Sequence, residues 1–101
     1  MSDDPFLSAA DWDFPVPIRY GPGRLAEVGR LCAAAGCRNP LIVTDRATAK
    51  LAFVETLRGH LRAAGLAHGS FVDVSPNPAD IEVVAGKAAF HAAGHDGIIA
   101  L

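Results

Sequence analysis

Asp45 is the side chain whose type and position point most directly to ligand chemistry. It follows Leu41–Thr44, an apolar run without alternation that is typical of a strand buried on both faces of a sheet. An acidic residue at the end of such a strand can bind both hydroxyls of an adenosine ribose and repel a 2′-phosphate. Asp is also a favourable N-cap for a following helix. The two roles are compatible, and the sequence leaves both open.

Two further residues bear on the same chemistry. Arg46, next to Asp45, carries a guanidinium that could pair with a 2′-phosphate, so the choice between NAD and NADP stays open. Asn77 lies between Pro76 and Pro78, just after a predicted strand at residues 70–74. The prolines could present the Asn77 amide rigidly to a ligand, and the alternative is a stiff turn that only begins the next helix.

The remaining reactive side chains do not form a catalytic group. His91 and His95 have the spacing of a helical metal pair, but Gly94 is expected to end the helix between them, and no third ligand is near in sequence. Cys32 and Cys37 have no histidine nearby and are typical of small core residues. We therefore expect neither a catalytic residue nor a metal ligand in this chain.

A glycine motif resembles a dinucleotide fingerprint without having its context. Gly21, Gly23 and Ala26 satisfy its loose spacing, and Asp45 lies at about the expected distance beyond them. However, the preceding segment is too polar and proline-rich for a buried first strand. Pro22 also lacks the backbone N–H that such a loop directs at phosphate. We therefore interpret the motif as a turn before a helix.

Hydrophobic periodicity predicts alternating strands and helices after an irregular segment at residues 1–15. Pro17 restricts the first strand to a sheet edge. Helices and strands in alternation imply βαβ crossovers and a parallel sheet covered on both sides. The expected helices span residues 25–35, 47–64 and 81–92, and the expected strands span residues 16–20, 41–44, 70–74 and 98–101.

Size and composition exclude several classes of protein. A chain of 101 residues is one domain at most. Its net charge of −2 and pI of about 6.0 provide no basic surface for nucleic acid or an anionic membrane. No apolar run is long enough to cross a bilayer, and the acidic N-terminus is unlike a secretory signal. We expect a cytoplasmic protein with reduced cysteines.

The chain ends on a strand predicted at residues 98–101, whose continuous apolar run is typical of a buried strand. In open parallel sheets, ligands bind beyond the carboxyl ends of the strands. We therefore expect a fragment that stops where a ligand-binding loop would begin.

Several segments, in order, resemble the N-terminal half of the iron-containing alcohol dehydrogenase family. They are Pro17–Gly23, Leu41–Asp45, Ala64–Leu66, Val74–Pro78 and Asp96–Leu101. The resemblance implies that Asp45 contacts the adenosine ribose and that Asn77 lies against the cofactor. It also implies that the last strand leads into a Gly-Gly-Gly-Ser loop that binds the pyrophosphate. The sequence departs from the family at Ala79, where Thr is frequent, and at residues 46–48, where a Gly is common.

In that family, iron or sometimes zinc is held by an Asp and His residues of a helical C-terminal domain, which has no counterpart here. The hypothesis from the sequence is therefore a partial N-terminal dinucleotide-binding domain, residues 1–101, with a Rossmann-like α/β fold. The parent would be an NAD(P)- and metal-dependent enzyme that transfers hydride between an alcohol and nicotinamide, as a possible homo-oligomer. The isolated chain would be inactive. The alternatives are a glycerol dehydrogenase-like or dehydroquinate synthase-like fragment, or a small non-catalytic α/β binding module.

Overall fold

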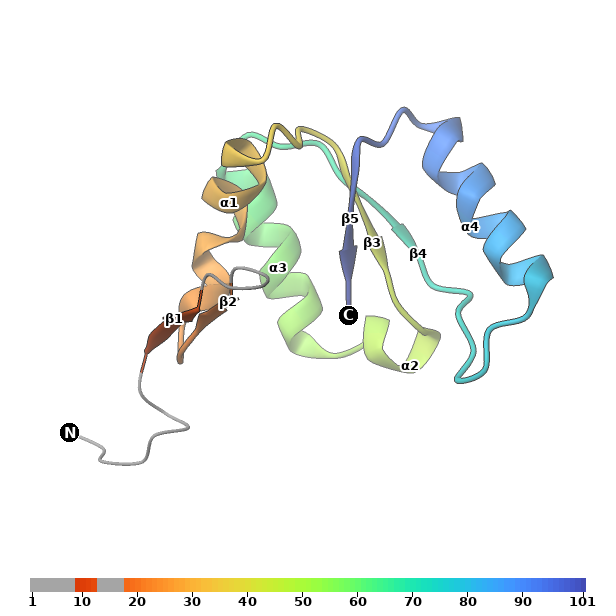
Figure 1. The fold of residues 1–101 in the computed structure, drawn as a ribbon, viewed down its shortest axis with the longest axis horizontal. Coiled ribbons are helices and arrows are strands. Elements are labelled where there is room, and N and C mark those ends of the chain that lie inside the picture. Colours follow the sequence, from red (N-terminus) through yellow and green to blue (C-terminus); the bar gives the residue numbers. More distant parts are fainter. Residues whose placement is uncertain (1–8, 13–17) are drawn as a thin grey trace.

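The computed structural model describes residues 9–12 and 18–101, so expectations for residues 1–8 and 13–17 lie outside the described part. A small hairpin precedes a parallel sheet with helices on both sides (Figure 1). The elements are β1 (Ala10–Trp12), β2 (Ile18–Tyr20), the 3₁₀ helix η1 (Arg24–Glu27), α1 (Val28–Ala34), β3 (Pro40–Val43), α2 (Arg46–Ala49), α3 (Ala52–Ala63), β4 (Gly69–Phe71), α4 (Asp80–Ala92) and β5 (Gly97–Ala100).

The main sheet has three parallel strands in the order β4-β3-β5. At the centre, Ile42 of β3 is in register with Ser70 of β4 and with Ile99 of β5. The chain moves from β3 to β4 through α2 and α3, and then back across β3 to β5 through α4. Right-handed crossovers in opposite directions place their helices on opposite faces. Helices α3 and α4 do flank the sheet from opposite sides, which confirms the predicted Rossmann-like α/β arrangement (Figure 1).

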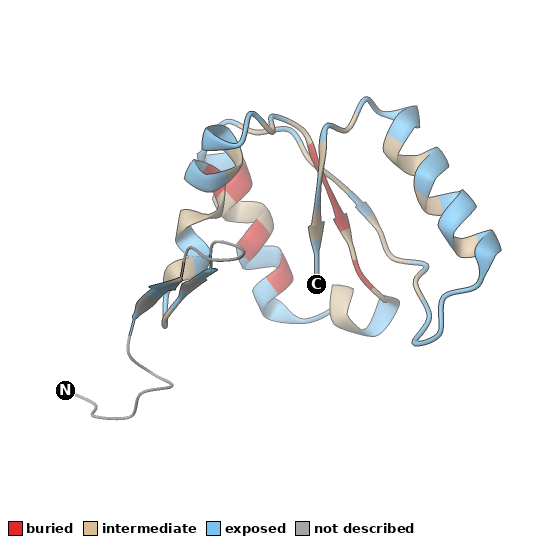
Figure 2. Ribbon diagram, in the orientation of Figure 1, coloured by how far each residue is buried: buried red, intermediate tan, exposed pale blue. Residues whose placement is uncertain are grey.

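The core lies between the sheet and α3. Ile42, Leu57 and Leu61 are fully buried and form one cluster, and Val28 and Ile99 are among the residues packed against it. Leu57 and Leu61 lie one helical turn apart, so the same face of α3 meets the sheet. The buried segments of β3 and α3 face each other in Figure 2.

The opposite face of the sheet is covered incompletely. No residue of α4 is buried, and Ile81, Val83 and Val84 are exposed. An apolar cavity of about 460 Å³ separates α4 from the sheet, with Phe71 and Phe90 among its lining residues. The helix therefore shields this face without filling the space beneath it.

The strand predicted at residues 98–101 is present as β5, but the prediction that it is buried was wrong. Ile98 is 62% exposed and Leu101 is 42% exposed. The physical reason is that β5 lies at the sheet edge, with β3 as its one neighbour in the described sheet. A continuous apolar run indicates a strand, but it does not specify what covers that strand.

The N-terminal strands differ from the predicted arrangement. β1 lies within the segment expected to be irregular, and it pairs with β2 in an antiparallel hairpin. The hairpin is separate from the parallel sheet, so the strand expected at residues 16–20 is not an edge of that sheet. Pairing between Trp12 and Ile18 depends on contacts that strand periodicity does not encode.

Two predicted helices are divided. The helix expected at residues 25–35 begins as η1 and continues as α1. The helix expected at residues 47–64 is interrupted before α3, where Leu51 is extended, with φ −74° and ψ 146°. Gly36 and Gly65 follow the ends of α1 and α3 in left-handed conformations, with φ of 77° and 75°.

Candidate binding site at the carboxyl edge of the sheet

A cavity of about 410 Å³ lies where the three parallel strands end. Each strand contributes to it through the residues at its carboxyl end. The connections that leave β3 and β4 pass to opposite faces of the sheet, and a crevice therefore opens at this edge. In open parallel sheets, such a crevice is the usual position of a ligand. The lining residues are Val43, Thr44, Asp45, Val74, Ser75, Pro76, Ala100 and Leu101.

Thr44 supplies a buried polar group to this cavity. Thr44 is 2% exposed, and its Oγ1 has no hydrogen-bond partner among the described residues. A buried hydroxyl without a partner costs about 1–3 kcal/mol. A polar ligand atom in the cavity could therefore gain a partner here with little competition from solvent.

Asp45 caps the short helix α2, as one of its two predicted roles required. The backbone N–H of Thr48 donates to Oδ1 at 2.7 Å, and the Thr48 hydroxyl donates to Oδ2 at 2.8 Å. These two hydrogen bonds, the backbone one foremost, lower the pKa of Asp45, so the carboxylate is ionised at neutral pH. Each oxygen retains a lone pair for another donor. Capping therefore does not prevent Asp45 from accepting hydrogen bonds from a ligand.

Arg46 forms an ion pair across the edge of the sheet. Its Nε and Nη2 donate to Oδ1 of Asp73 at 2.9 and 2.7 Å. The Arg46 side chain is 77% exposed and that of Asp73 is 54% exposed, so solvent screens the pair. The pair links the segment after β3 to the segment after β4. Its two residues are far apart in sequence, and no local pattern indicates that they meet.

Asn77 lies on the turn that joins β4 to α4. It is exposed and is not among the residues that line the cavity, whereas its neighbours Ser75 and Pro76 are. The Ser75 hydroxyl donates to the Asn77 backbone oxygen at 3.1 Å. The structure therefore places Asn77 beside the cavity without giving its amide a contact there.

Glu82 stabilises this turn, although it is not among the residues predicted from the sequence. Its carboxylate accepts hydrogen bonds from the backbone N–H of Ser75 at 2.9 Å, from the Ser75 hydroxyl at 2.8 Å and from the backbone N–H of Ala79 at 2.5 Å. A Glu at the third position of a helix is half of a capping box, and this pattern could have identified it. The reciprocal bond is missing because Ala79 has no side-chain oxygen.

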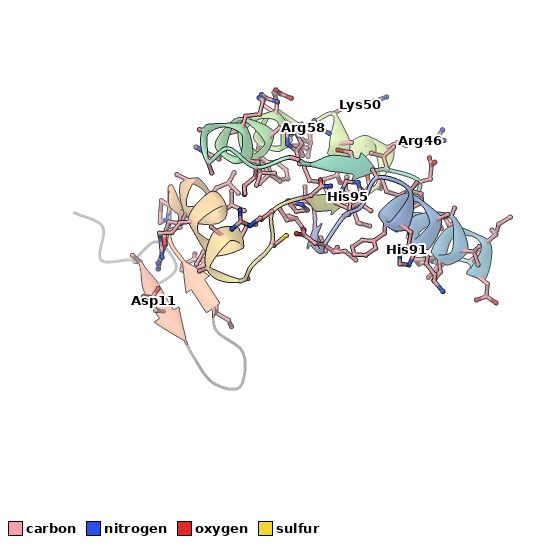
Figure 3. The ribbon with its side chains drawn as sticks, turned by 90° about the horizontal axis from the view of Figure 1, so that it is seen from above. Asp11, Arg46, Lys50, Arg58, His91 and His95 are labelled. Atoms are coloured by element: carbon pink, nitrogen blue, oxygen red, sulfur yellow. The ribbon has the colours of Figure 1, made fainter. Side chains whose placement is uncertain are left out.

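His91 and His95 lie away from the cavity. His91 is exposed on α4, whereas His95 follows the helix, and its Nδ1 lies 3.0 Å from the Asn39 backbone oxygen (Figure 3). The Phe90 ring lies beside both imidazoles, with centroid distances of 5.4 and 6.4 Å. The two imidazoles therefore share Phe90 as a neighbour, and His95 has the additional contact with Asn39.

The two cysteines are free and lie near the amino ends of the strands. Cys37 donates from Sγ to Oδ1 of Asp96 at 3.2 Å. Burial, followed by the contact with Asp96, raises the pKa of Cys37 to about 11. Burial also raises the pKa of Cys32. Both thiols are thus protonated at neutral pH, which makes them poor nucleophiles.

Within residues 9–12 and 18–101, no group of three or more His, Cys, Asp or Glu side chains could hold a metal ion. The described residues therefore do not fit a metal centre. After dialysis, we expect elemental analysis of the purified chain to find no stoichiometric iron or zinc. Tight binding of one metal per chain would contradict this prediction and would direct attention back to His91 and His95.

The fold and the edge cavity together define an α/β protein with a Rossmann-like parallel sheet. The sequence profile of the family described as iron-containing alcohol dehydrogenase matches residues 15–101. The chain belongs to this family, which confirms the resemblance found in the sequence.

Solved alcohol dehydrogenases are similar to the chain in structure. A 1,3-propanediol oxidoreductase has a TM-score of 0.76 and 35% identity, over 79% of this chain and 21% of that protein. An alcohol dehydrogenase from Oenococcus oeni has a TM-score of 0.71 and 26% identity, over 78% and 21% of the two chains. A mutant of an archaeal halo-thermophilic alcohol dehydrogenase from a Red Sea brine pool has a TM-score of 0.71 and 25% identity, over 78% and 20%.

The chain thus spans about one fifth of the length of these solved relatives. A search of curated proteins found no match. In the described residues, no helix is both long enough and apolar enough to span a membrane.

Proposed function

We propose that this chain forms the adenosine side of the dinucleotide site in an NAD(P)- and metal-dependent alcohol dehydrogenase. Residues 1–101 would be part of the N-terminal dinucleotide-binding domain of that enzyme. The observation that carries the proposal is a cavity at the carboxyl edge of a parallel sheet, with the ionised Asp45 in its wall, in a chain of this family. The chemistry supplied by the bound nicotinamide is acceptance or donation of a hydride.

The role proposed for this chain is binding rather than catalysis. Asp45 would accept hydrogen bonds from the ribose hydroxyls, and Asn77 would lie against the cofactor. The buried Thr44 hydroxyl supports a polar ligand at this place. The described residues do not fit a metal, so its ligands and the alcohol-binding groups would belong to other parts of the whole protein. In this proposal the 101-residue chain by itself is inactive.

The Asp45→Ser variant of the whole protein tests this proposal. Ser remains a good N-cap, so the variant removes the charge while preserving the start of α2. We expect NAD to bind roughly ten- to a hundredfold more weakly, the effect of losing hydrogen bonds to a charged group. NADP should be favoured relative to NAD, because the repulsion of its 2′-phosphate is removed. Calorimetry with both cofactors measures the two affinities without relying on activity.

Glu55→Gln is the matched control for this experiment. It removes one negative charge from a carboxylate that pairs with Arg58 and Arg62 on α3. Its ratio of NAD to NADP affinity should equal that of the unmodified protein. An unchanged ratio in Asp45→Ser would show that Asp45 is a helix cap and not a ribose ligand.

A further inference from the structure

The turn between β4 and α4 is held mainly by one side chain from outside it. Residues 75–79 are all exposed. Pro76 and Pro78 have no backbone N–H and cannot donate hydrogen bonds. Inside the turn, the Ser75 hydroxyl donates to the Asn77 backbone oxygen at 3.1 Å. A segment with so few bonds of its own needs an external group to fix its position.

Glu82 supplies that group from the first turn of α4. Oε1 accepts from the Ser75 backbone N–H at 2.9 Å. Oε2 accepts from the Ser75 hydroxyl at 2.8 Å and from the Ala79 backbone N–H at 2.5 Å. A single carboxylate therefore holds both ends of the turn. The hydrogen bonds from Ala79 and Ser75 lower the pKa of Glu82, so the carboxylate is ionised and strongly accepting at neutral pH.

The same turn forms a wall of the edge cavity. Ser75 and Pro76 line it together with Thr44 and Asp45, which come from the end of β3. Glu82 itself is not among the lining residues, so it acts on the cavity through Ser75. A movement of the turn would therefore alter the shape of the cavity.

We propose that Glu82 is a positioning residue that holds the Ser75–Ala79 turn against the edge cavity and thereby sets its affinity for an adenosine-containing dinucleotide. The inference rests on the proposed function, because it takes the ligand of the cavity to be NAD or NADP. It extends that function by assigning a role to a residue that does not line the cavity.

Glu82→Gln can separate this role from helix capping. The Gln oxygen can still accept from the Ala79 backbone N–H, because Gln is an accepted residue at this capping position. Its amide N–H₂ is a donor and cannot accept from Ser75. With its oxygen in the place of Oε2, the variant keeps the contacts with the Ala79 N–H and the Ser75 hydroxyl, and it loses the hydrogen bond from the Ser75 backbone N–H.

The experiment measures NAD affinity by calorimetry and the free energy of unfolding by denaturant titration, both in the whole protein. In Glu82→Gln we expect roughly three- to tenfold weaker NAD binding, the scale of one net hydrogen bond. The unfolding midpoint should stay close to that of the unmodified protein. Ser75→Ala removes the hydroxyl contacts and should weaken NAD binding in the same direction.

Asp80→Asn is the matched control, because it removes a carboxylate charge from the same helical turn, and its side chain makes no hydrogen bond or ion pair within the described residues. Because both variants remove one negative charge, this control shows how the charge alone affects binding of the anionic NAD. We expect the NAD affinity of Asp80→Asn to equal that of the unmodified protein. Failure of the unmodified protein to bind NAD or NADP would refute the proposed function. If NAD binds but Glu82→Gln behaves like Asp80→Asn, Glu82 is a helix cap and the positioning role is wrong.

Discussion

Leu57→Ala should lower the free energy of unfolding by about 2–5 kcal/mol, the usual cost of such a truncation in a core. Leu57 is fully buried and packs with Ile42 and Leu61 in the cluster between α3 and the sheet. The loss combines the transfer free energy of the removed carbons with the cavity that they leave. Domains of this kind have a total stability of only about 5–15 kcal/mol, so the variant could be largely unfolded at physiological temperature.

Leu51→Ala provides the comparison, because it makes the same chemical change one helical segment earlier. Leu51 is 52% exposed, so its truncation should cost far less than that of Leu57. Urea denaturation followed by circular dichroism measures both variants. Equal losses of stability would show that the cluster around Leu57 is not the main core of this chain.

Leu57 and Leu51 also show what the sequence could and could not predict. Both leucines fit the apolar spacing of one helix at residues 47–64, and Leu57 lies in the core. Leu51 is instead the extended residue that separates α2 from α3. Neither Gly nor Pro marks this interruption, so local patterns contain no signal for it.

Burial could be predicted from the sequence for the central strand, which has a strand on each side, but not for a strand at the sheet edge. β3 is central, and Leu41 and Ile42 are buried as its apolar run predicts. β5 has a similar composition but lies at an edge, where Ile98 is exposed. Composition sets the preference for a strand, whereas burial depends on which elements pack against it.

In the candidate site, too, the sequence predicts some features and only the fold shows others. The capping role of Asp45 follows from residue type and position, and the structure confirms it. The ion pair between Arg46 and Asp73 joins two loops that are distant in sequence, so only the fold brings them together. The ribose contact of Asp45 and the cofactor contact of Asn77 remain predictions, which the binding experiments with NAD and NADP address.

Gly29→Ala should lower the free energy of unfolding by about 1–3 kcal/mol, although alanine is the better helix former. Gly29 is the one buried residue of α1, and a Cβ built there would lie 2.4 Å from the Cβ of Ala64. Ala64 closes α3 and has a short, rigid side chain. Relief of this overlap therefore requires the two helices to separate, which would disturb packing along α1 and α3.

Gly59→Ala is the control that isolates this steric effect. Gly59 lies inside α3, and a Cβ there would meet no atom within 4 Å. The substitution should stabilise the protein by about 0.5–1 kcal/mol through helix propensity alone. The two Gly→Ala variants should thus differ by about 1.5–4 kcal/mol in denaturant titrations, with opposite signs relative to the unmodified chain. Ala64→Gly should restore part of the stability of Gly29→Ala because it removes the overlapping methyl group. If Gly29→Ala were as stable as Gly59→Ala, the close packing of α1 on α3 would be wrong.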